Sequence, residues 1–124
     1  MSASKLFMLL LTFFLSLGGP RASLADGNEM LRFCQTAMHV YENSGGTSDQ
    51  MAEVWRCISY LRGFADVMIH SSDFEDLVCW PEGGVPPIQM ARIFVKYGTE
   101  NPQLLHLDEL ELIIFSLVES FPCE

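Results

Sequence analysis

The chain has 124 residues, which is enough for one domain and too few for a TIM barrel or a two-domain enzyme. Its 16 Asp and Glu residues outnumber its seven Lys and Arg residues, so the formal net charge is −9. A charge of this sign argues against binding to nucleic acid or to an anionic membrane surface, and it leaves a basic or uncharged partner compatible with the sequence.

The N-terminal segment, residues 1–25, has the three parts of a secretory signal peptide. Lys5 supplies a positive charge, and an almost unbroken apolar run follows from Leu6 to Leu17. Ser23 and Ala25 place small residues at the −3 and −1 positions of a cleavage site. The alternative is a membrane anchor, but about 12 apolar residues are too few to cross roughly 30 Å of hydrocarbon. We therefore predict cleavage after Ala25.

Cleavage at this position would leave one domain, residues 26–124, with five Lys and Arg residues, 16 Asp and Glu residues and a net charge of −11. Its 46 apolar residues among 99 are a normal fraction for a globular domain. All four cysteines of the chain lie in this part. An even number of cysteines in a small exported domain predicts two disulfide bonds.

The first predicted helix covers about residues 28–43, where apolar side chains recur on one face and a Ser-Gly-Gly sequence follows. The second covers about residues 49–70, and Thr47 with Gln50 fits a capping box at its start. Apolar residues on two sides of this second helix predict that it is the central one. We expect Gly63, in its interior, to let another helix approach closely.

A polar break from residue 71 to residue 87 separates the second helix from the third. The third begins near Pro87, which suits a first helical position, and ends at residues 101–102, because a residue before proline avoids the helical conformation. The fourth runs from about residue 107 to residue 121, with acidic residues in its first turns. No segment is typical of a strand. The predicted fold class is all-α, a small disulfide-stapled bundle of about four helices.

Four cysteines allow three disulfide pairings, and their spacing favours Cys34 with Cys57 and Cys79 with Cys123. The midpoint of Cys34 and Cys57 in the sequence is 45.5, in the turn between the first two helices. Residues equidistant from that turn lie level in an antiparallel helical hairpin. The midpoint of Cys79 and Cys123 is residue 101, at the break between the last two helices. The crossed pairings lack this symmetry.

No catalytic or metal-binding pattern is present in the sequence. It has no Cys-x-x-Cys, no two histidines four residues apart, no nucleophile elbow and no phosphate-binding loop. Paired cysteines would leave no thiolate nucleophile. The acid pairs Glu75–Asp76 and Glu109–Glu111 are explained by a polar loop and by a solvated helix face. We therefore expect no enzyme activity, no metal and no cofactor.

In the loop between the second and third helices, Trp80 lies among acidic residues and beside a predicted disulfide. The acidic residues would keep the loop soluble, but solubility does not explain the tryptophan. Aromatic anchors surrounded by charge are favoured at protein interfaces. The alternative is that Trp80 packs into the core and the acids only solubilise the loop. Both interpretations stay open. The candidate partner-binding residues are Asp73, Glu75, Asp76, Trp80 and Glu82.

Four short motifs, in chain order, resemble one known family. The sequence from Cys57 to Phe64 is similar to its Cys-x-x-Tyr-x-x-Gly helix, and the sequence from Cys79 to Val85 is similar to its Cys-x-Pro-Glu-Gly-Val loop. The turn from Tyr97 to Leu107 and the ending Phe121-Pro-Cys123 extend the match over essentially the whole mature chain. On these motifs the chain resembles the Rap/Tai family of immunity proteins, which protect bacteria from amidase effectors of type VI secretion.

The resemblance implies an exported, all-helical, disulfide-bonded protein of the periplasm, often a homodimer. It implies a peptidoglycan amidase as partner, whose active-site groove is plugged sterically without any catalysis by the immunity protein. An acidic binder with a charge of −11 would be steered toward a basic groove.

Two other interpretations remain. A small periplasmic acid-stress chaperone of the HdeA kind is also short, helical, exported and disulfide-bonded. Its acids would be protonated below about pH 3, and the resulting positive charge could open a dimer. A small exported enzyme is the third interpretation, and it requires a free cysteine or a strained nucleophile.

Overall fold

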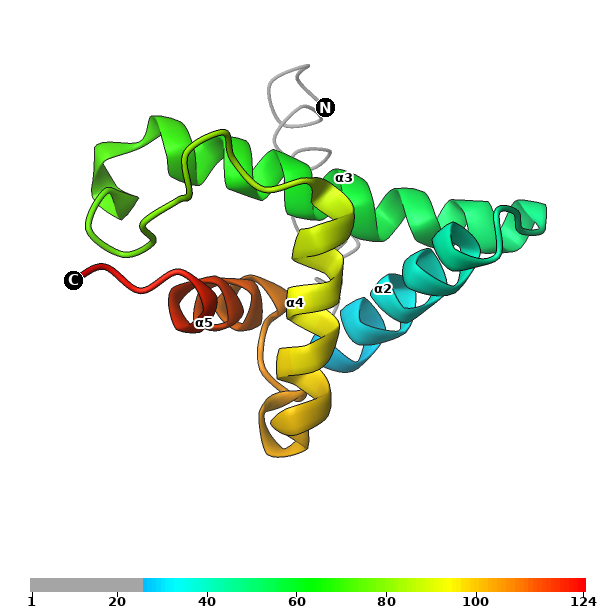
Figure 1. Ribbon diagram of the computed structural model, residues 1–124. Helices are drawn as coiled ribbons and strands as arrows, with labels where there is room; N and C mark the ends of the chain where they lie inside the picture. The colour runs from blue at the N-terminus through cyan, green and yellow to red at the C-terminus, as the bar shows by residue number, and fades with distance from the viewer. Residues whose placement is uncertain (1–25) are drawn as a thin grey trace, which may run out of the picture.

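The computed structural model describes residues 26–124, so the predicted signal peptide, residues 1–25, lies outside the described part. This part contains four α-helices and two short 3-10 turns (Figure 1), with no strand among these residues beyond an isolated bridge between Asp26 and Asp108. The all-α fold class is confirmed. The elements are α2 (Gly27–Glu42), α3 (Ser48–His70), η1 (Ser72–Phe74), α4 (Pro87–Glu100), η2 (Pro102–Leu104) and α5 (Glu109–Ser120).

The helix ends follow local chemistry that is visible in the sequence. The predicted capping box is present at α3, where the Thr47 side chain accepts from the Gln50 backbone N–H and the Gln50 side chain accepts from the Thr47 backbone N–H. Helix α4 begins at Pro87, as predicted. Helix α5 begins two residues later than predicted, because Asp108 caps it by accepting from the Leu110 N–H at 2.9 Å.

The central helices are α2 and α4, because each of them contacts the other three, and α4 begins in front of α3 in Figure 1. The prediction that the second helix is central is therefore wrong. Helix α3 has 23 residues, and its buried residues, such as Leu61 and Met68, lie along one stripe that faces α2 and α4. Its other sides stay at the surface, where Trp55 is 64% exposed and Val67 is 56% exposed.

The buried side chains form one cluster to which all four helices contribute. Phe94 of α4 and Ile113 of α5 are fully buried. The other buried apolar members come from α2, α3, α4, α5 and the loop before α4: Met30, Phe33, Cys34, Ala37, Cys57, Leu61, Ala65, Met68, Val78, Met90, Ala91, Leu112 and Leu117. Within residues 26–124 no helix combines the length and the apolar character needed to cross a membrane.

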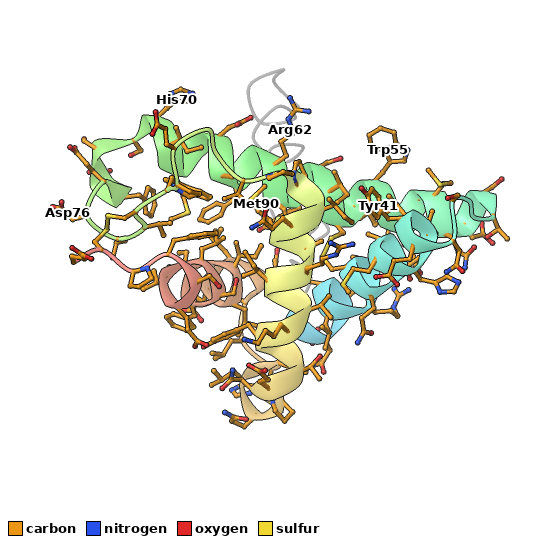
Figure 2. All side chains as sticks on the ribbon, in the orientation of Figure 1. Tyr41, Trp55, Arg62, His70, Asp76 and Met90 are labelled. Carbon is orange, nitrogen blue, oxygen red and sulfur yellow. A yellow bond between two sulfur atoms is a disulfide. The ribbon has the colours of Figure 1, made fainter. Side chains whose placement is uncertain are left out.

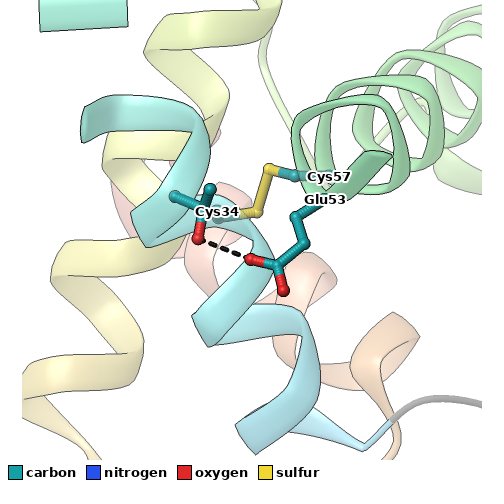
Figure 3. Close-up of a disulfide and its surroundings, with 4 residues drawn as sticks. Cys34, Glu53 and Cys57 are labelled. Carbon is teal, nitrogen blue, oxygen red and sulfur yellow. Dashed lines mark hydrogen bonds between the residues drawn. A yellow bond between two sulfur atoms is a disulfide. The ribbon is translucent and has the colours of Figure 1, made fainter. Parts of the chain in front are cut away.

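Two disulfides cross-link the segments around this small core, and the sequence spacing predicted both pairings. Cys34 in α2 bonds Cys57 in α3, and Cys79 in the loop after η1 bonds Cys123 at the end of the chain. Figure 3 shows the first bond between α2 and α3, where the Thr36 hydroxyl donates to the Glu53 carboxylate at 2.7 Å. The sequence separations are 23 and 44 residues.

Two glycines lie where neighbouring segments leave no room for a side chain. A Cβ on Gly27 would clash with the Leu112 side chain and would lie 2.9 Å from the Leu105 carbonyl oxygen. A Cβ on Gly98 would meet the Leu105 side chain at 3.3 Å. The expectation that Gly63 permits a close helix approach is wrong for residues 26–124, because none of their atoms lies within 4 Å of its Cβ position. Gly63 falls on a side of α3 that no other described helix covers.

We expect alanine to act in opposite directions at Gly27 and Gly63. Gly27→Ala should lower the free energy of unfolding by about 1–3 kcal/mol, because the added methyl must displace Leu112 and approach the Leu105 carbonyl. Gly63→Ala should raise it by about 0.5–1 kcal/mol, because an open position inside a helix gains helix propensity. Denaturant unfolding of both variants beside the wild type measures the two shifts. Destabilisation by Gly63→Ala would contradict the open position of this residue.

Candidate partner-binding site

The structure gathers the five candidate partner-binding residues in the connection between α3 and α4. Asp73 lies in η1, Glu75 and Asp76 follow it directly, and Glu82 lies in the turn before Gly83. All four acidic side chains are exposed. Figure 2 shows Asp76 at the outer edge of this loop, on the side of the molecule away from α2.

Trp80 is neither fully buried in the core nor fully exposed, so its environment lies between the two alternatives that the sequence left open. It is only partly buried, and its ring stacks on Phe121 with 6.0 Å between centroids and 30° between planes. Its indole N–H is shielded from solvent and has no hydrogen-bond partner among the described residues. Buried indole N–H groups usually find a partner. The side chain thus packs against the core through one face and leaves another face at the surface.

Two hollows meet at Trp80. The first has a volume of about 430 Å³ and lies between the Arg62–Ile69 part of α3, the Gly83–Gly84 pair and the start of α4. The second has a volume of about 460 Å³ and is lined by the end of α3, by Phe74 and Glu75, and by Trp80. Gly83 and Gly84 have φ values of 89° and 77°, a region that glycine adopts at little cost, so the loop turns sharply beside the first hollow.

The acidity of the protein is concentrated in the segments that follow Arg62 of α3 and the end of α4. Residues 63–86 and 101–124 together contain ten Asp and Glu residues and no Lys or Arg. Residues 27–62 and 87–100 together contain five Asp and Glu residues and five Lys and Arg residues. We call the first pair of segments the acidic side and the second pair the neutral side. The Cys79–Cys123 bond and a 3.0 Å hydrogen bond from the Cys79 N–H to the Phe121 carbonyl join the two acidic segments.

Four of the five cations of the neutral side have a partner on that side: Arg32, Arg56, Arg92 and Lys96. The Arg32 guanidinium pairs with the Glu53 carboxylate, and the Arg92 guanidinium lies 5.7 Å from the centre of the Tyr41 ring. A hydrogen bond from Thr36, followed by the interactions with Arg32, lowers the pKa of Glu53 against the opposing effect of burial. The two acidic segments contain no Lys or Arg, and the fifth cation of the neutral side, Arg62, lines the first hollow beside Trp80.

A buried carboxylate lies at the start of α5, where the sequence predicted a solvated face. Glu109 is 2% exposed, and its Oε2 atom has no hydrogen-bond partner among the described residues. Burial and the nearby negative charges of Glu109 and Asp108 raise the pKa of Tyr60 to about 12. Helical periodicity could not identify this burial, because Glu109 lies in the first turn, where neighbouring segments decide what is covered.

No group of three or more His, Cys, Asp or Glu side chains in residues 26–124 is arranged to hold a metal ion. The three histidines, His39, His70 and His106, are exposed. Both cysteine pairs are oxidised, so the described part has no free thiol. The loop between α3 and α4 presents exposed acidic side chains together with the partly buried ring of Trp80.

A family model of Rap1a immunity proteins matches residues 26–123 of the chain. No curated protein and no solved structure matches it. The match covers nearly the whole described part, so the chain belongs to the Rap1a immunity protein family. These proteins are inhibitors and not enzymes, and the family implies immunity against type VI effectors with a protein effector as the partner.

The position of Glu109 near Tyr60 predicts that the Tyr60 hydroxyl ionises at an unusually high pH. Tyr60 should lose its proton at about pH 12, and Glu109→Gln should lower that pKa, because it removes the adjacent negative charge. Since the folded pKa lies above the usual value of about 10, the stability contributed by protonated Tyr60 is complete below about pH 10 and is lost as the pH rises through the folded value.

An ultraviolet absorbance titration of phenolate, with Tyr60→Phe subtracted, isolates this group from Tyr41 and Tyr97. An unchanged pKa of Tyr60 in the Glu109→Gln protein would show that the carboxylate does not act on the hydroxyl.

Proposed function

We propose that the chain is exported to the periplasm, loses residues 1–25, and there binds and sterically blocks a peptidoglycan amidase effector of type VI secretion. Membership of the Rap1a immunity protein family supports the immunity role. The signal-peptide pattern supports export. The two disulfides support an oxidising compartment, since such bonds are rare in a reducing cytosol.

The observation that carries the choice of surface is the concentration of charge around Trp80. Ten acids without a Lys or Arg give the acidic side a negative field that attracts a basic groove and accelerates encounter with it. Trp80 then supplies an aromatic anchor at the centre of that field. Tryptophan is among the residues that most often contribute large binding free energies at the centre of an interface.

Inhibition by this surface needs no chemical step. The Cys79–Cys123 bond and the stacking of Trp80 on Phe121 hold the loop after η1 against the body of the protein. A loop restrained in this way loses little conformational entropy when it enters a groove. Occupying the groove excludes the peptide stem of peptidoglycan from the nucleophile of the amidase. A homodimer would present two such loops.

The proposal predicts that binding depends on the acids of the loop. Replacing Asp73, Glu75, Asp76 and Glu82 by their amides should slow association with the cognate amidase effector by roughly 10-fold or more at low salt. The same change should weaken the salt dependence of association, because the steering field is reduced. Stopped-flow association and inhibition of peptidoglycan cleavage measure the two effects.

A matched control removes the same number of charges from the neutral side, by making amides of Glu29, Glu42, Asp49 and Glu100. These side chains are exposed, and the ion pairs of Glu29 and Glu100 are long, at 4.0 Å, so their loss should cost little. Equal slowing by both variants would mean that total charge, and not this loop, governs binding. The proposal would be contradicted if the wild-type protein bound no peptidoglycan hydrolase.

Export makes a separate prediction about the covalent form of the protein. The periplasmic protein should have the intact mass of residues 26–124 less four hydrogen atoms, because signal cleavage and two disulfides leave that species. Mass spectrometry of the periplasmic fraction, before and after reduction, tests both features. A mass that includes residues 1–25, or a protein confined to the cytosol, would contradict it.

A further inference from the structure

The second hollow beside Trp80 differs from the first in the groups that line it. Its volume is about 460 Å³, and its walls come from the end of α3, from η1 with the residue after it, and from the loop before α4. Phe74 and Trp80 supply aromatic rings, and Glu75 supplies a carboxylate. No Lys or Arg of the described residues lines it, whereas Arg62 lines the first hollow. We call the second one the aromatic hollow.

The end of α3 adds backbone carbonyl groups to the walls of the aromatic hollow. The Val67 carbonyl accepts from the Ser71 N–H at 3.0 Å, but the carbonyls of the last helical residues, 68–70, accept from no backbone N–H of the described residues. Residues 68–70 all line the hollow, and Figure 2 shows His70 at this end of the helix. The carboxyl end of a helix carries a partial negative charge, so it favours a nearby cation.

The aromatic ring and the surrounding charge favour a cation as well. One face of Trp80 stacks on Phe121, and the side chain also borders the hollow, where a cation can lie against the ring. Asp73 and Asp76 are exposed and flank the lining residues Phe74 and Glu75 in the chain. Aromatic rings, a carboxylate and unpaired carbonyls thus meet in one hollow on the acidic side.

We propose that the aromatic hollow binds the guanidinium group of an arginine side chain of the effector. A guanidinium is planar, stacks on aromatic faces, and carries five N–H donors that can serve the Glu75 carboxylate and the free carbonyls together. The proposal rests on the proposed function and names the chemical group that the acidic side receives.

Other side chains fit the aromatic hollow less well. An apolar side chain would cover Glu75 and the carbonyls of residues 68–70 without supplying a donor, and burying unpaired polar groups costs free energy. A carboxylate would be repelled by Glu75 and by the end of α3. A lysine ammonium has three donors, is more strongly hydrated, and does not match a planar ring as a guanidinium does.

The test uses the mature, disulfide-bonded protein with Trp55→Phe, which leaves Trp80 as its one tryptophan. Trp55 is 64% exposed, so the change should leave the fold intact. N-acetyl-argininamide is the probe, and its uncharged isostere N-acetyl-citrullinamide is the matched control. Both are titrated while the fluorescence of Trp80 and the NMR shift of its indole N–H are recorded. Measuring at pH 8 limits protonation of His70, which also lines the hollow.

The arginine probe should bind saturably with a dissociation constant of about 1–10 mM, and the citrulline probe about 10-fold more weakly or worse. Glu75→Gln should weaken binding of the arginine probe about three- to fivefold, because it removes the carboxylate of the hollow. The matched control is Glu119→Gln, which removes the same charge from an exposed position of α5 on the acidic side, outside the hollow. It should bind the probe as the parent protein does.

Three results would overturn the proposal: no saturable response to the arginine probe, equal binding of the two probes, or equal weakening by Glu75→Gln and Glu119→Gln. Circular dichroism checks that each variant is folded. Amidase inhibition separates this proposal from the proposed function. A protein that inhibits the amidase but whose hollow ignores the arginine probe would contradict this proposal alone. A protein that binds the probe selectively but inhibits no amidase would contradict the proposed function and leave the guanidinium selectivity of the hollow in place.

Discussion

The disulfide between Cys79 and Cys123 joins the two segments of the chain that repel each other most. These segments carry ten acids and no Lys or Arg, and nothing in their charge favours their proximity. Closing a 44-residue loop stabilises the fold by about 4 kcal/mol in the loop-entropy account, which is a large share of a usual 5–15 kcal/mol. The stacking of Trp80 on Phe121 lies directly beside this bond. One covalent link therefore makes an acidic surface with an aromatic centre possible.

The position of α4 explains how the rest of the molecule is divided. Together with α2 it packs against one side of α3, so α3 is covered along one stripe only and its remaining apolar residues are left at the surface. The acidic side and the neutral side thus lie on different parts of the same small domain. This division separates the charged surface, which we propose for effector binding, from the neutral one.

Local chemistry made much of the fold predictable from the sequence. Pro87 marks a helix start because proline has no backbone N–H, and the capping box of Thr47 and Gln50 marks another because their side chains accept from free backbone N–H groups. Both signals depend only on a few neighbouring residues. The cysteine pairing was predictable because a helical hairpin relates positions by their distance from the turn. The family resemblance rested on structural residues of this kind, and the family match agrees with it.

The remaining features depend on tertiary neighbours that periodicity does not contain. Apolar residues on two sides of α3 are equally expected for a central helix and for a helix with an interface, so the sequence could not tell the two apart. Glu109 is acidic in a first helical turn, where solvent exposure is the usual expectation, yet neighbouring segments cover it. The acidic side joins segments that lie far apart in the chain, and only the fold brings them together.

The central claim is that the acidic side is the surface that meets the effector. Hydrogen–deuterium exchange of the mature protein, with and without the amidase bound, tests it most directly, because it reports protection along the backbone without any substitution. We predict new protection in residues 71–86 and in the last residues around Phe121, with residues 37–58 unchanged. Protection confined to residues 37–58 would contradict the account, because it would place the effector on the neutral side.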